Sequence, residues 1–517
     1  MRKTMLRKIR IVLALVFFVG VTFLFLDFTG TVHAWLGWMA KIQFVPAVLA
    51  LNFGAVAVLV LLTLVFGRIY CSVICPLGVM QDVIAWLGKK SRKNRYSYSP
   101  AKSWLRYTVL AVFIVAMIAG IGSLVALLEP YSIFGRIASN LLAPVYGWIN
   151  NLFALIAERA DSYAFYETEV WLRSLPTFIV AAVMLVLIFV LAWRNGRTWC
   201  NTVCPVGTFL SFLARFSWLK PVIDTEKCIS CRKCERNCKA SCIDISSHSI
   251  DYSRCVACMD CIGSCPKDAV SYRHLKMAGK HAASSASGSG DLKSDGVDAS
   301  RRSFLSASLM TAAAVTVGAQ EKKVDGGLAK IEDKAIPDRN TPVVPPGAVG
   351  LRHFLQHCTG CQLCVSVCPN EVLRPATDLI RMMQPEMSYE RGYCRPECTR
   401  CSEVCPAGAI LPIDRAEKSS IQIGHAVWVK KNCIPFRDGH ACGNCARHCP
   451  TGAITMVPLK GGHQYRGGRG ETEGERTVMV PAVNTERCIG CGACENLCPA
   501  RPFTAIYVEG NEVHRTV

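Results

Sequence analysis

The chain has 517 residues, 29 of them cysteine, with 58 Lys and Arg against 38 Asp and Glu. This length excludes a small disulfide-stapled secreted fold, and a composition of 51% apolar and 19% charged residues excludes a mainly disordered chain. The net charge of +20 resides almost wholly in residues 1–319, because residues 320–517 carry 24 basic and 21 acidic side chains. The basic residues therefore accompany long apolar stretches, which is typical of the cytoplasmic flanks of membrane helices and not of a nucleic-acid-binding face.

Residues 1–220 contain four stretches long and apolar enough to cross a bilayer, which takes about 20 helical residues. The predicted spans are residues 11–32, 44–66, 109–128 and 175–193. The loops on one side of these spans carry 16 Lys and Arg, and those on the other side carry four. Both ends of this four-helix domain are therefore expected in the cytoplasm. A weaker apolar stretch, residues 133–157, contains Pro and Asn and is expected to lie on the outer face.

Three polar residues follow the third predicted span, namely Glu129, Tyr131 and Arg136. Ionisable groups at a membrane edge are functional candidates, and a carboxylate, a phenol and a guanidinium together could form a quinone site. Capping of the following helix is the alternative role for these side chains.

A sequence pattern occurs twice, each time where a predicted span reaches the cytoplasm. Both copies read G-R-x-aromatic-C-x3-C-P-x-G, with Cys71 and Cys75 in the first and Cys200 and Cys204 in the second. Because residues i and i+4 share a helix face, each copy can aim two thiols in one direction. Two such pairs could present four thiolates to one further metal centre at the membrane surface. The alternative is a helix-ending turn whose thiols are incidental.

Residues 221–275 contain two cysteine runs of the spacing C-x2-C-x2-C-x3-C. The runs are Cys228, Cys231, Cys234, Cys238 and Cys255, Cys258, Cys261, Cys265. In two-cluster ferredoxins the fourth cysteine of each run binds the [4Fe–4S] cluster of the other run. This predicts a cytoplasmic two-cluster domain in which Cys265 joins the first run and Cys238 joins the second. Lys239 occupies the position where proline is usual, and Cys242 has no partner set and is expected to be structural.

Residues 276–300 are rich in Ala, Ser and Gly and are expected to form a flexible linker. Arg301 and Arg302 then precede a mildly apolar stretch, an order similar to a bacterial twin-arginine export signal. Thiolates exported unfolded would oxidise, so a metal-loaded domain is better exported already folded. We therefore expect residues 320–517 in the periplasm, held by residues 301–319 as a fifth helix or released by processing after Ala319.

The exported region contains four more cysteine runs, two of regular spacing outermost and two variants between them. They are Cys358, Cys361, Cys364, Cys368; Cys394, Cys398, Cys401, Cys405; Cys433, Cys442, Cys445, Cys449; and Cys488, Cys491, Cys494, Cys498. Neither disulfide geometry nor the paired spacing of zinc sites suits such compact runs. The chain is therefore predicted to hold six [4Fe–4S] clusters. Three pairings of the later runs are open, and their regularity favours first with fourth and second with third.

These motifs resemble known proteins. Residues 1–270 resemble the membrane-bound (NapH-type) ferredoxin subunit of periplasmic nitrate reductase systems, through the four spans, the C-x3-C-P repeat and the two cysteine runs. Residues 301–517 resemble the twin-arginine-exported (NapG/MauM-type) ferredoxin with four clusters. Lys239 and the fusion of both parts into one chain depart from that pattern. The resemblance implies oxidation of quinol, such as menaquinol, from the membrane quinone pool and delivery of electrons to a periplasmic reductase or cytochrome.

The expected fold is an α-helical membrane domain of four transmembrane helices, followed by α+β ferredoxin-like poly-[4Fe–4S] domains, in a bacterial inner membrane. The leading hypothesis for function is an electron-transfer component of a quinol dehydrogenase. A relay from a cytoplasmic ferredoxin or flavoprotein to the periplasm is the first alternative, because quinol oxidation alone would not require the cytoplasmic cluster pair. A metalloenzyme maturation factor is the second. The sequence contains no Walker loop or dinucleotide fingerprint, and no nucleic acid is expected as a partner.

Overall fold

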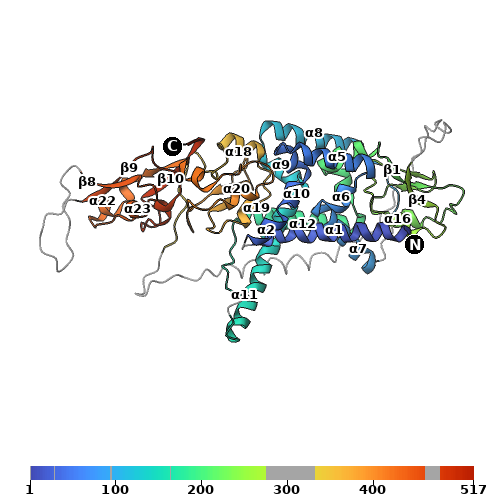
Figure 1. Cartoon of the computed structure of the whole chain (residues 1–517), viewed down its shortest axis with the longest axis horizontal. Coiled ribbons are helices and arrows are strands. Elements are labelled where there is room, and N and C mark those ends of the chain that lie inside the picture. The colour runs from blue at the N-terminus through green and yellow to red at the C-terminus, as the bar shows by residue number, and fades with distance from the viewer. Residues whose placement is uncertain are drawn as a thin grey trace, which may run out of the picture.

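The computed structural model describes residues 2–27, 30–92, 96–162, 165–274, 332–459 and 478–516. The predicted linker and twin-arginine segment, residues 276–319, lie outside these ranges. The described chain is elongated, as Figure 1 shows. A helical unit (residues 2–214) lies in the middle, a small unit (residues 219–274) at one end and a large unit (residues 332–516) at the other.

The helical unit alternates long apolar helices with short connecting ones. Its elements are α1 (Arg2–Leu26), α2 (Thr31–Leu36), α3 (Trp38–Lys41), α4 (Phe44–Leu49), α5 (Phe53–Phe66), α6 (Ile69–Val73), α7 (Pro76–Arg92), α8 (Ser103–Ala119), α9 (Gly122–Leu128), α10 (Pro130–Ile137), the π-helical turn η1 (Ala138–Leu142), α11 (Ala143–Arg159), α12 (Leu175–Asn195), α13 (Thr198–Thr202) and α14 (Pro205–Ala214).

Three helices of the described chain are long and apolar enough to cross a membrane, which indicates a membrane protein. They are Met5–Leu26 within α1, the continuous helix Pro130–Arg159 and α12. The first and last correspond to predicted spans. The predicted spans at residues 44–66 and 109–128 each form two shorter helices instead of one long one.

Local backbone geometry explains both interruptions. Leu51 has φ 51°, and the Asn52 side chain accepts a hydrogen bond from Ala55 N–H, so α5 begins with a new cap after α4 ends. Gly120 has φ 73° and ends α8 in the left-handed conformation before α9 begins. Neither interruption follows from hydropathy, because the residues on both sides remain apolar.

The stretch at residues 133–157 also differs from its expected place on the outer face. It belongs to a helix that begins at Pro130, and the whole of α10 is buried against α7 and α12. Ile133, Phe134 and Ile137 supply the apolar side chains that allow this burial. Within this long helix, α11 is the part that projects, and in Figure 1 it runs across the direction of α1 and α12.

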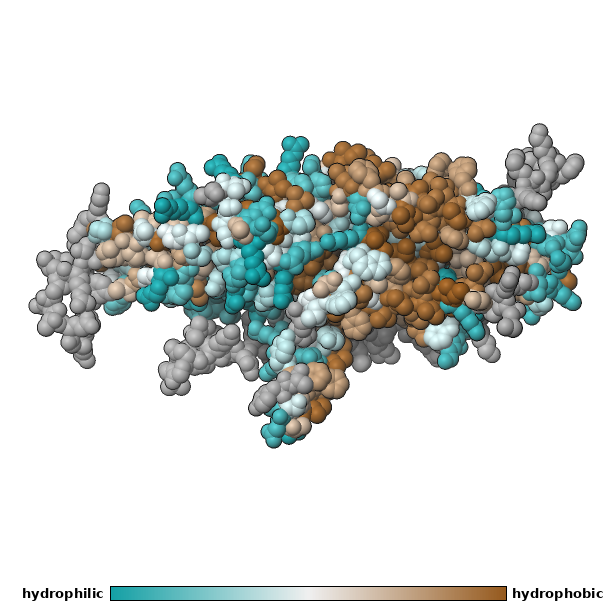
Figure 2. Space-filling view, in the orientation of Figure 1, coloured by the Kyte–Doolittle hydropathy of each residue, from teal (hydrophilic) through white to brown (hydrophobic). Residues whose placement is uncertain are grey.

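Apolar side chains cover the middle of the molecule and polar side chains cover both ends, as Figure 2 shows. The exposed apolar residues of the middle region belong largely to the long helices, among them Val16 of α1, Leu61 of α5, Ile118 of α8 and Val183 of α12. Such an apolar region on the face shown is typical of a surface that faces lipid.

The small and large units consist of short helices and two-stranded antiparallel sheets. The small unit contains β1 (Leu219–Ile223), α15 (Lys233–Arg236), β2 (Ile243–Asp244), β3 (Ser249–Ile250), α16 (Asp260–Ser264) and β4 (Val270–His274), with β1 paired to β4 and β2 to β3. The large unit contains α18 (Leu351–His357), α19 (Leu363–Ser366), β5 (Leu373–Pro375), β6 (Pro385–Met387), α20 (Arg400–Val404), α21 (Arg415–Ser420), β7 (Ile421–Trp428), η3 (Lys430–Asn432), α22 (Ile434–Asp438), α23 (Asn444–Arg447), β8 (Ile454–Pro458), β9 (Met479–Val483), α24 (Ala493–Asn496) and β10 (Ile506–Thr516). In it β5 pairs with β6, β8 with β9 and β7 with β10.

Candidate metal centres

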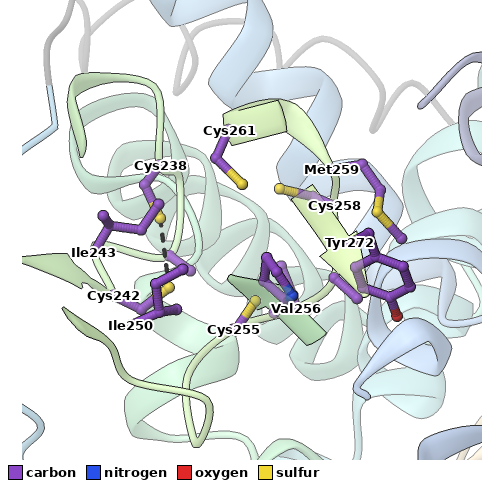
Figure 3. A pocket seen from close by; sticks show the side chains of 13 residues that line it. Cys238, Cys242, Ile243, Ile250, Cys255, Val256, Cys258, Met259, Cys261 and Tyr272 are labelled. Carbon is purple, nitrogen blue, oxygen red and sulfur yellow. Dashed lines mark hydrogen bonds between the residues drawn. The ribbon is translucent and has the colours of Figure 1, made fainter. Parts of the chain in front are cut away.

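The small unit gathers its cysteines into two groups of four. One cavity of about 330 Å³ is lined by Cys228, Cys231, Cys234 and Cys265, and another of about 420 Å³ by Cys238, Cys255, Cys258 and Cys261. These are the two groups that the exchange of fourth cysteines predicts. Figure 3 shows the sulfurs of the second group around its cavity.

The large unit gathers its cysteines into four groups, again with an exchange of fourth cysteines. Three of them line cavities of about 280–340 Å³: Cys358, Cys361, Cys364, Cys405; Cys449, Cys488, Cys491, Cys494; and Cys433, Cys442, Cys445, Cys498. In the fourth group, Cys401 is in electrostatic contact with Cys368, Cys394 and Cys398.

The favoured pairing of these later runs is therefore wrong. The first run exchanges its fourth cysteine with the second, and the third with the fourth. Neighbouring runs pair because a short connection loses less conformational entropy on closure than a long one. Regular spacing within a run determines its local loop and carries no information about its spatial neighbour.

The four regular runs share one backbone conformation. In each, the residues two and four positions after the first cysteine have φ between 50° and 79°: Ser230 and Arg232, Ala257 and Met259, Gly360 and Gln362, Gly490 and Gly492. Alternation of left-handed and ordinary residues turns successive N–H groups toward one point, an arrangement found around anions and iron–sulfur sites. The two variant runs, Cys394 to Cys401 and Cys433 to Cys445, do not have this pattern at those positions.

Each group fits a [4Fe–4S] cluster, which would be held by its four cysteine sulfurs and would supply one-electron transfer when bound. The sulfurs in a cluster bind four different iron atoms and so stand further apart than the ligands of one ion. No three His, Cys, Asp or Glu side chains of the described ranges lie close enough to hold a single metal ion. The left-handed residues of the regular runs, which turn N–H groups toward the cysteine sulfurs, support the cluster interpretation.

The C-x3-C-P cysteines form a further buried group between the small unit and the membrane helices. Cys71, Cys75, Cys200 and Cys204 are each 4% exposed, and Cys204 is in electrostatic contact with the other three. We call these four residues the thiol quartet. Burial raises the pKa of Cys75 and of Cys204, which favours the neutral thiol at both positions.

The two arginines of the repeat each cross to the opposite copy. Arg68 donates to the Cys200 carbonyl at 3.1 Å, and Arg197 donates to the Cys71 carbonyl at 2.6 Å. A Cβ atom at Gly207 would overlap Cys200 O and one at Gly78 would overlap Cys71 O, so both motif glycines are required by close backbone approach. The repeat thus builds one two-sided site in which guanidinium groups can offset thiolate charge.

A buried ion network joins this site to the small unit. Asp82 Oδ1 accepts from Arg197 Nε at 2.8 Å and lies 3.3 Å from Lys239 Nζ, while its Oδ2 lies 2.8 Å from Arg10 Nη1. Lys239 also pairs with Asp260 at 2.9 Å. Burial alone would raise the pKa of Asp82, but attraction to the three cations outweighs it and holds that pKa well below its usual range. Lys239, which replaces the usual proline, thus connects two acidic side chains of different units.

The proposed quinone residues lie at the contact between the helical and large units. Glu129 is 1% exposed and caps α10 by accepting hydrogen bonds from Tyr131 N–H at 3.0 Å and from Ser132 N–H. Arg136 donates to Ala126 O at 2.7 Å and to Gly360 O of the large unit at 3.5 Å. Helix capping, the alternative role, therefore accounts for Glu129. Glu129, Tyr131 and Arg136 nevertheless all lie at this contact.

Tyr131 is the member of this set that faces a cluster site. It is fully buried, lies in electrostatic contact with Cys361 and Cys405, and its hydroxyl has no hydrogen-bond partner among the described residues. Its ring packs against Phe25 with centroids 5.7 Å apart. The first cysteine group of the large unit therefore rests directly on the membrane helices.

For several residues of these sites, no role was predicted from the sequence. Asp82 lies on α7 seven residues after Cys75, and its partners come from distant parts of the sequence. Lys418 donates to Arg395 O at 2.5 Å and to Cys398 O, and so supports the loop of a variant run. Among these residues, only the arginines of the repeat could have been identified from the sequence, because they occupy the same position in both copies.

Family models match both halves of the chain. One described as a 4Fe-4S binding domain matches residues 48–95 and 177–223, each of which contains one C-x3-C-P motif. One described as a 4Fe-4S dicluster domain matches residues 357–409, which contain the first two runs, and residues 440–501, which contain the last two runs except Cys433. No solved structure matches the chain.

The curated relatives match about a third of the chain. The methylamine utilization ferredoxin-type protein MauM of Paracoccus denitrificans is 32% identical over 177 residues, which are 33% of this chain and 73% of that protein. The chain belongs to the ferredoxin-type proteins that include MauM. Ferredoxin-type protein NapF of Escherichia coli (strain K12) is 27% identical over 168 residues, 32% of this chain and 86% of that protein. MauM of Methylobacillus flagellatus is 31% identical over 165 residues, which are 31% of this chain and span only 64% of that relative's length. The chain is an iron–sulfur, ferredoxin-type electron-transfer protein with multiple [4Fe–4S] clusters.

Proposed function

We propose that this protein conducts electrons across a bacterial inner membrane, from the small unit through the helical unit to the large unit and a periplasmic reductase or cytochrome. The observation that carries the proposal is the continuous succession of cysteine groups from one end of the molecule to the other, with the thiol quartet between the two ferredoxin-like units.

Hydrogen bonds and electrostatic interactions connect several of the successive groups. Arg68 donates to Cys200 O of the thiol quartet and to Ser253 O, two residues before Cys255, at 3.1 and 3.2 Å. Tyr70 is in electrostatic contact with Cys75 and with Glu129, which is next to Tyr131. Within the large unit, Cys394 N–H donates to Cys491 O at 2.9 Å. These contacts support a route with seven successive sites.

The proposed orientation rests on where the units attach. The small unit ends with β4 and the large unit begins on the opposite side of the helical unit (Figure 1). If α1 and α12 cross the membrane, the connection between the units must cross it too, which suits the twin-arginine segment at residues 301–319. The broken pairs α4–α5 and α8–α9 would complete the predicted four spans.

Quinol oxidation by the same chain is the second candidate. It is favoured by the position of Tyr131 beside Cys361 and Cys405, where a reducing group bound at the membrane edge would be close to an acceptor. In this case electrons would enter at Glu129, Tyr131 and Arg136 from the quinone pool, and the small unit would not supply them.

The experiment compares the two donors on the purified full-length protein in lipid vesicles, without oxygen, with cluster reduction followed by EPR. Reduced ferredoxin should reduce the clusters of the large unit, and Cys71→Ser/Cys200→Ser should abolish this while leaving those of the small unit reducible. Reduction by a menaquinol analogue that survives this variant but is lost in Tyr131→Phe would overturn the conduit in favour of quinol oxidation. Normal electron supply beside a reductase that lacks its metal would instead indicate a maturation factor.

A further inference from the structure

Cys242 is a fifth sulfur at the cavity of the second cysteine group. It is 2% exposed and lies just before β2, and its carbonyl accepts from Asp251 N–H at 2.8 Å, which fixes its backbone. Its Sγ lies 3.5 Å from Cys238 Sγ, a contact drawn in Figure 3, and it also interacts electrostatically with the Cys255 side chain. Both partners belong to the group that would hold one cluster.

The Cys238 sulfur faces a thiol, whereas the described partners of other fourth cysteines are backbone N–H groups and, at Cys449, the Thr451 hydroxyl at 3.7 Å. Cys265 Sγ accepts from Ala269 N–H at 3.2 Å, and Cys449 Sγ accepts from Ala453 N–H at the same distance. Cys238 accepts from backbone N–H groups of the loop that follows it, as these do, and in addition faces the Cys242 thiol. Among the described cysteine groups, this is the one with a fifth thiol against its ligands.

Packing alone does not explain a thiol here. The same cavity is lined by Ala240, Ile243, Ile250 and Val256, so an apolar side chain at position 242 would fill the space equally well. A thiol adds one weak S–H donor. The sulfurs of Cys238 and Cys255 become stronger acceptors when they are thiolates, as they are when they bind iron.

We propose that Cys242 donates its S–H, shared between the Cys238 and Cys255 sulfurs, and thereby raises the reduction potential of the cluster held by Cys238, Cys255, Cys258 and Cys261. Reduction adds one negative charge to a cluster and its ligands, and a donor to the sulfurs stabilises that added charge. Cys242 is thus a positioning residue that makes this site a better acceptor, independently of which donor supplies the electron.

The test is an EPR-monitored redox titration of the anaerobic full-length protein and of Cys242→Ala and Cys242→Ser variants. The signal of this cluster is identified by its alteration in Cys258→Ser. In Cys242→Ala the midpoint potential of this signal should fall while those of the other clusters stay unchanged, and Cys242→Ser, which keeps a donor, should recover part of the shift.

Three results would overturn the proposal. An unchanged potential in Cys242→Ala would show that the thiol is only packing, and equal shifts in the Ala and Ser variants would show an effect of volume and not of hydrogen bonding. Loss of the cluster in Cys242→Ala together with its retention in Cys238→Ala would show that Cys242 is itself the fourth ligand. The titration uses no quinol or ferredoxin, so failure of the proposed electron route would leave its outcome unaffected.

Discussion

The small and large units attach to opposite ends of the same helices, yet the side chains at the two contacts differ in kind. The small unit is held by buried ion pairs that converge on Asp82 and Lys239. The described contact of the large unit instead consists of single hydrogen bonds, one exposed ion pair and close backbone approach, such as the hydrogen bond of 2.8 Å from Asn140 to Gln362 and the position of Gly135 against Cys361 O. The first contact should therefore respond to loss of charge, and the second to added volume.

Asp82→Asn should have the largest effect. It leaves Arg10, Arg197 and Lys239 without their shared carboxylate, and breaking a buried ion pair from one side costs about 3–5 kcal/mol. We expect a large fall in the thermal unfolding temperature of the small unit in detergent, with loss of the visible absorbance of its clusters. Asp224→Asn is the matched control, because its pair with Lys227 is exposed. Equal behaviour of the two variants would contradict the role of charge at this contact.

Gly135→Ala should weaken the other contact. The new methyl group would overlap Cys361 O and lie 2.7 Å from the Phe25 ring, and such overpacking costs about 1–3 kcal/mol. With a protease site introduced into the linker and cleaved, the large unit should stay on wild-type membranes and be released from those of the variant. Gly54→Ala, whose methyl group meets only Asn52 Oδ1 at 3.7 Å, should release nothing.

Lys239→Pro restores the residue that usually follows such a run and should have a smaller effect than Asp82→Asn. Asp82 keeps Arg10 and Arg197, and Asp260 keeps Arg7 at 2.8 Å, so each carboxylate retains a cation. We expect a loss of about 1–2 kcal/mol, because a partly compensated buried site is less costly than an unpaired one. Urea unfolding of the small unit measures it, and Lys239→Arg should keep most of the stability. A more stable proline variant would show that Lys239 does not hold the units together.

Glu169→Gln should have the smallest effect. Glu169 pairs with Arg391 of the large unit at 3.0 Å, but its side chain is 67% exposed. Exposed ion pairs contribute less than about 1 kcal/mol, so the release assay should hardly change and should not depend on salt concentration. Strong release at high salt would show that charge matters at both contacts.

The parts of the structure that could be predicted are those fixed by neighbours in sequence. Spacing predicts the loops around Cys228 and Cys255 because their geometry depends on a few successive φ angles. Hydropathy identifies α1 and α12, but it misses the break at Leu51, since a backbone change there leaves the apolar pattern intact.

The parts that could not be predicted depend on contacts between distant segments. Nothing near Glu129 in the sequence indicates that the large unit covers it, and Asp82 becomes notable only when Arg10 and Lys239 approach it. The thiol quartet could be predicted only in part. Its repeat was visible in sequence, whereas the crossing of its two arginines required the fold.

That crossing has a consequence for how such a site could arise. Arg68 donates a hydrogen bond to the Cys200 carbonyl, and Arg197 donates one to the Cys71 carbonyl. Each copy of the motif therefore completes the other in the same way. Such reciprocity is the property of an isologous contact between identical subunits. A shorter chain that holds half of the helical unit, with one copy of the motif, could therefore assemble the same site by pairing with a second molecule of itself, and gene duplication would then make the partnership permanent.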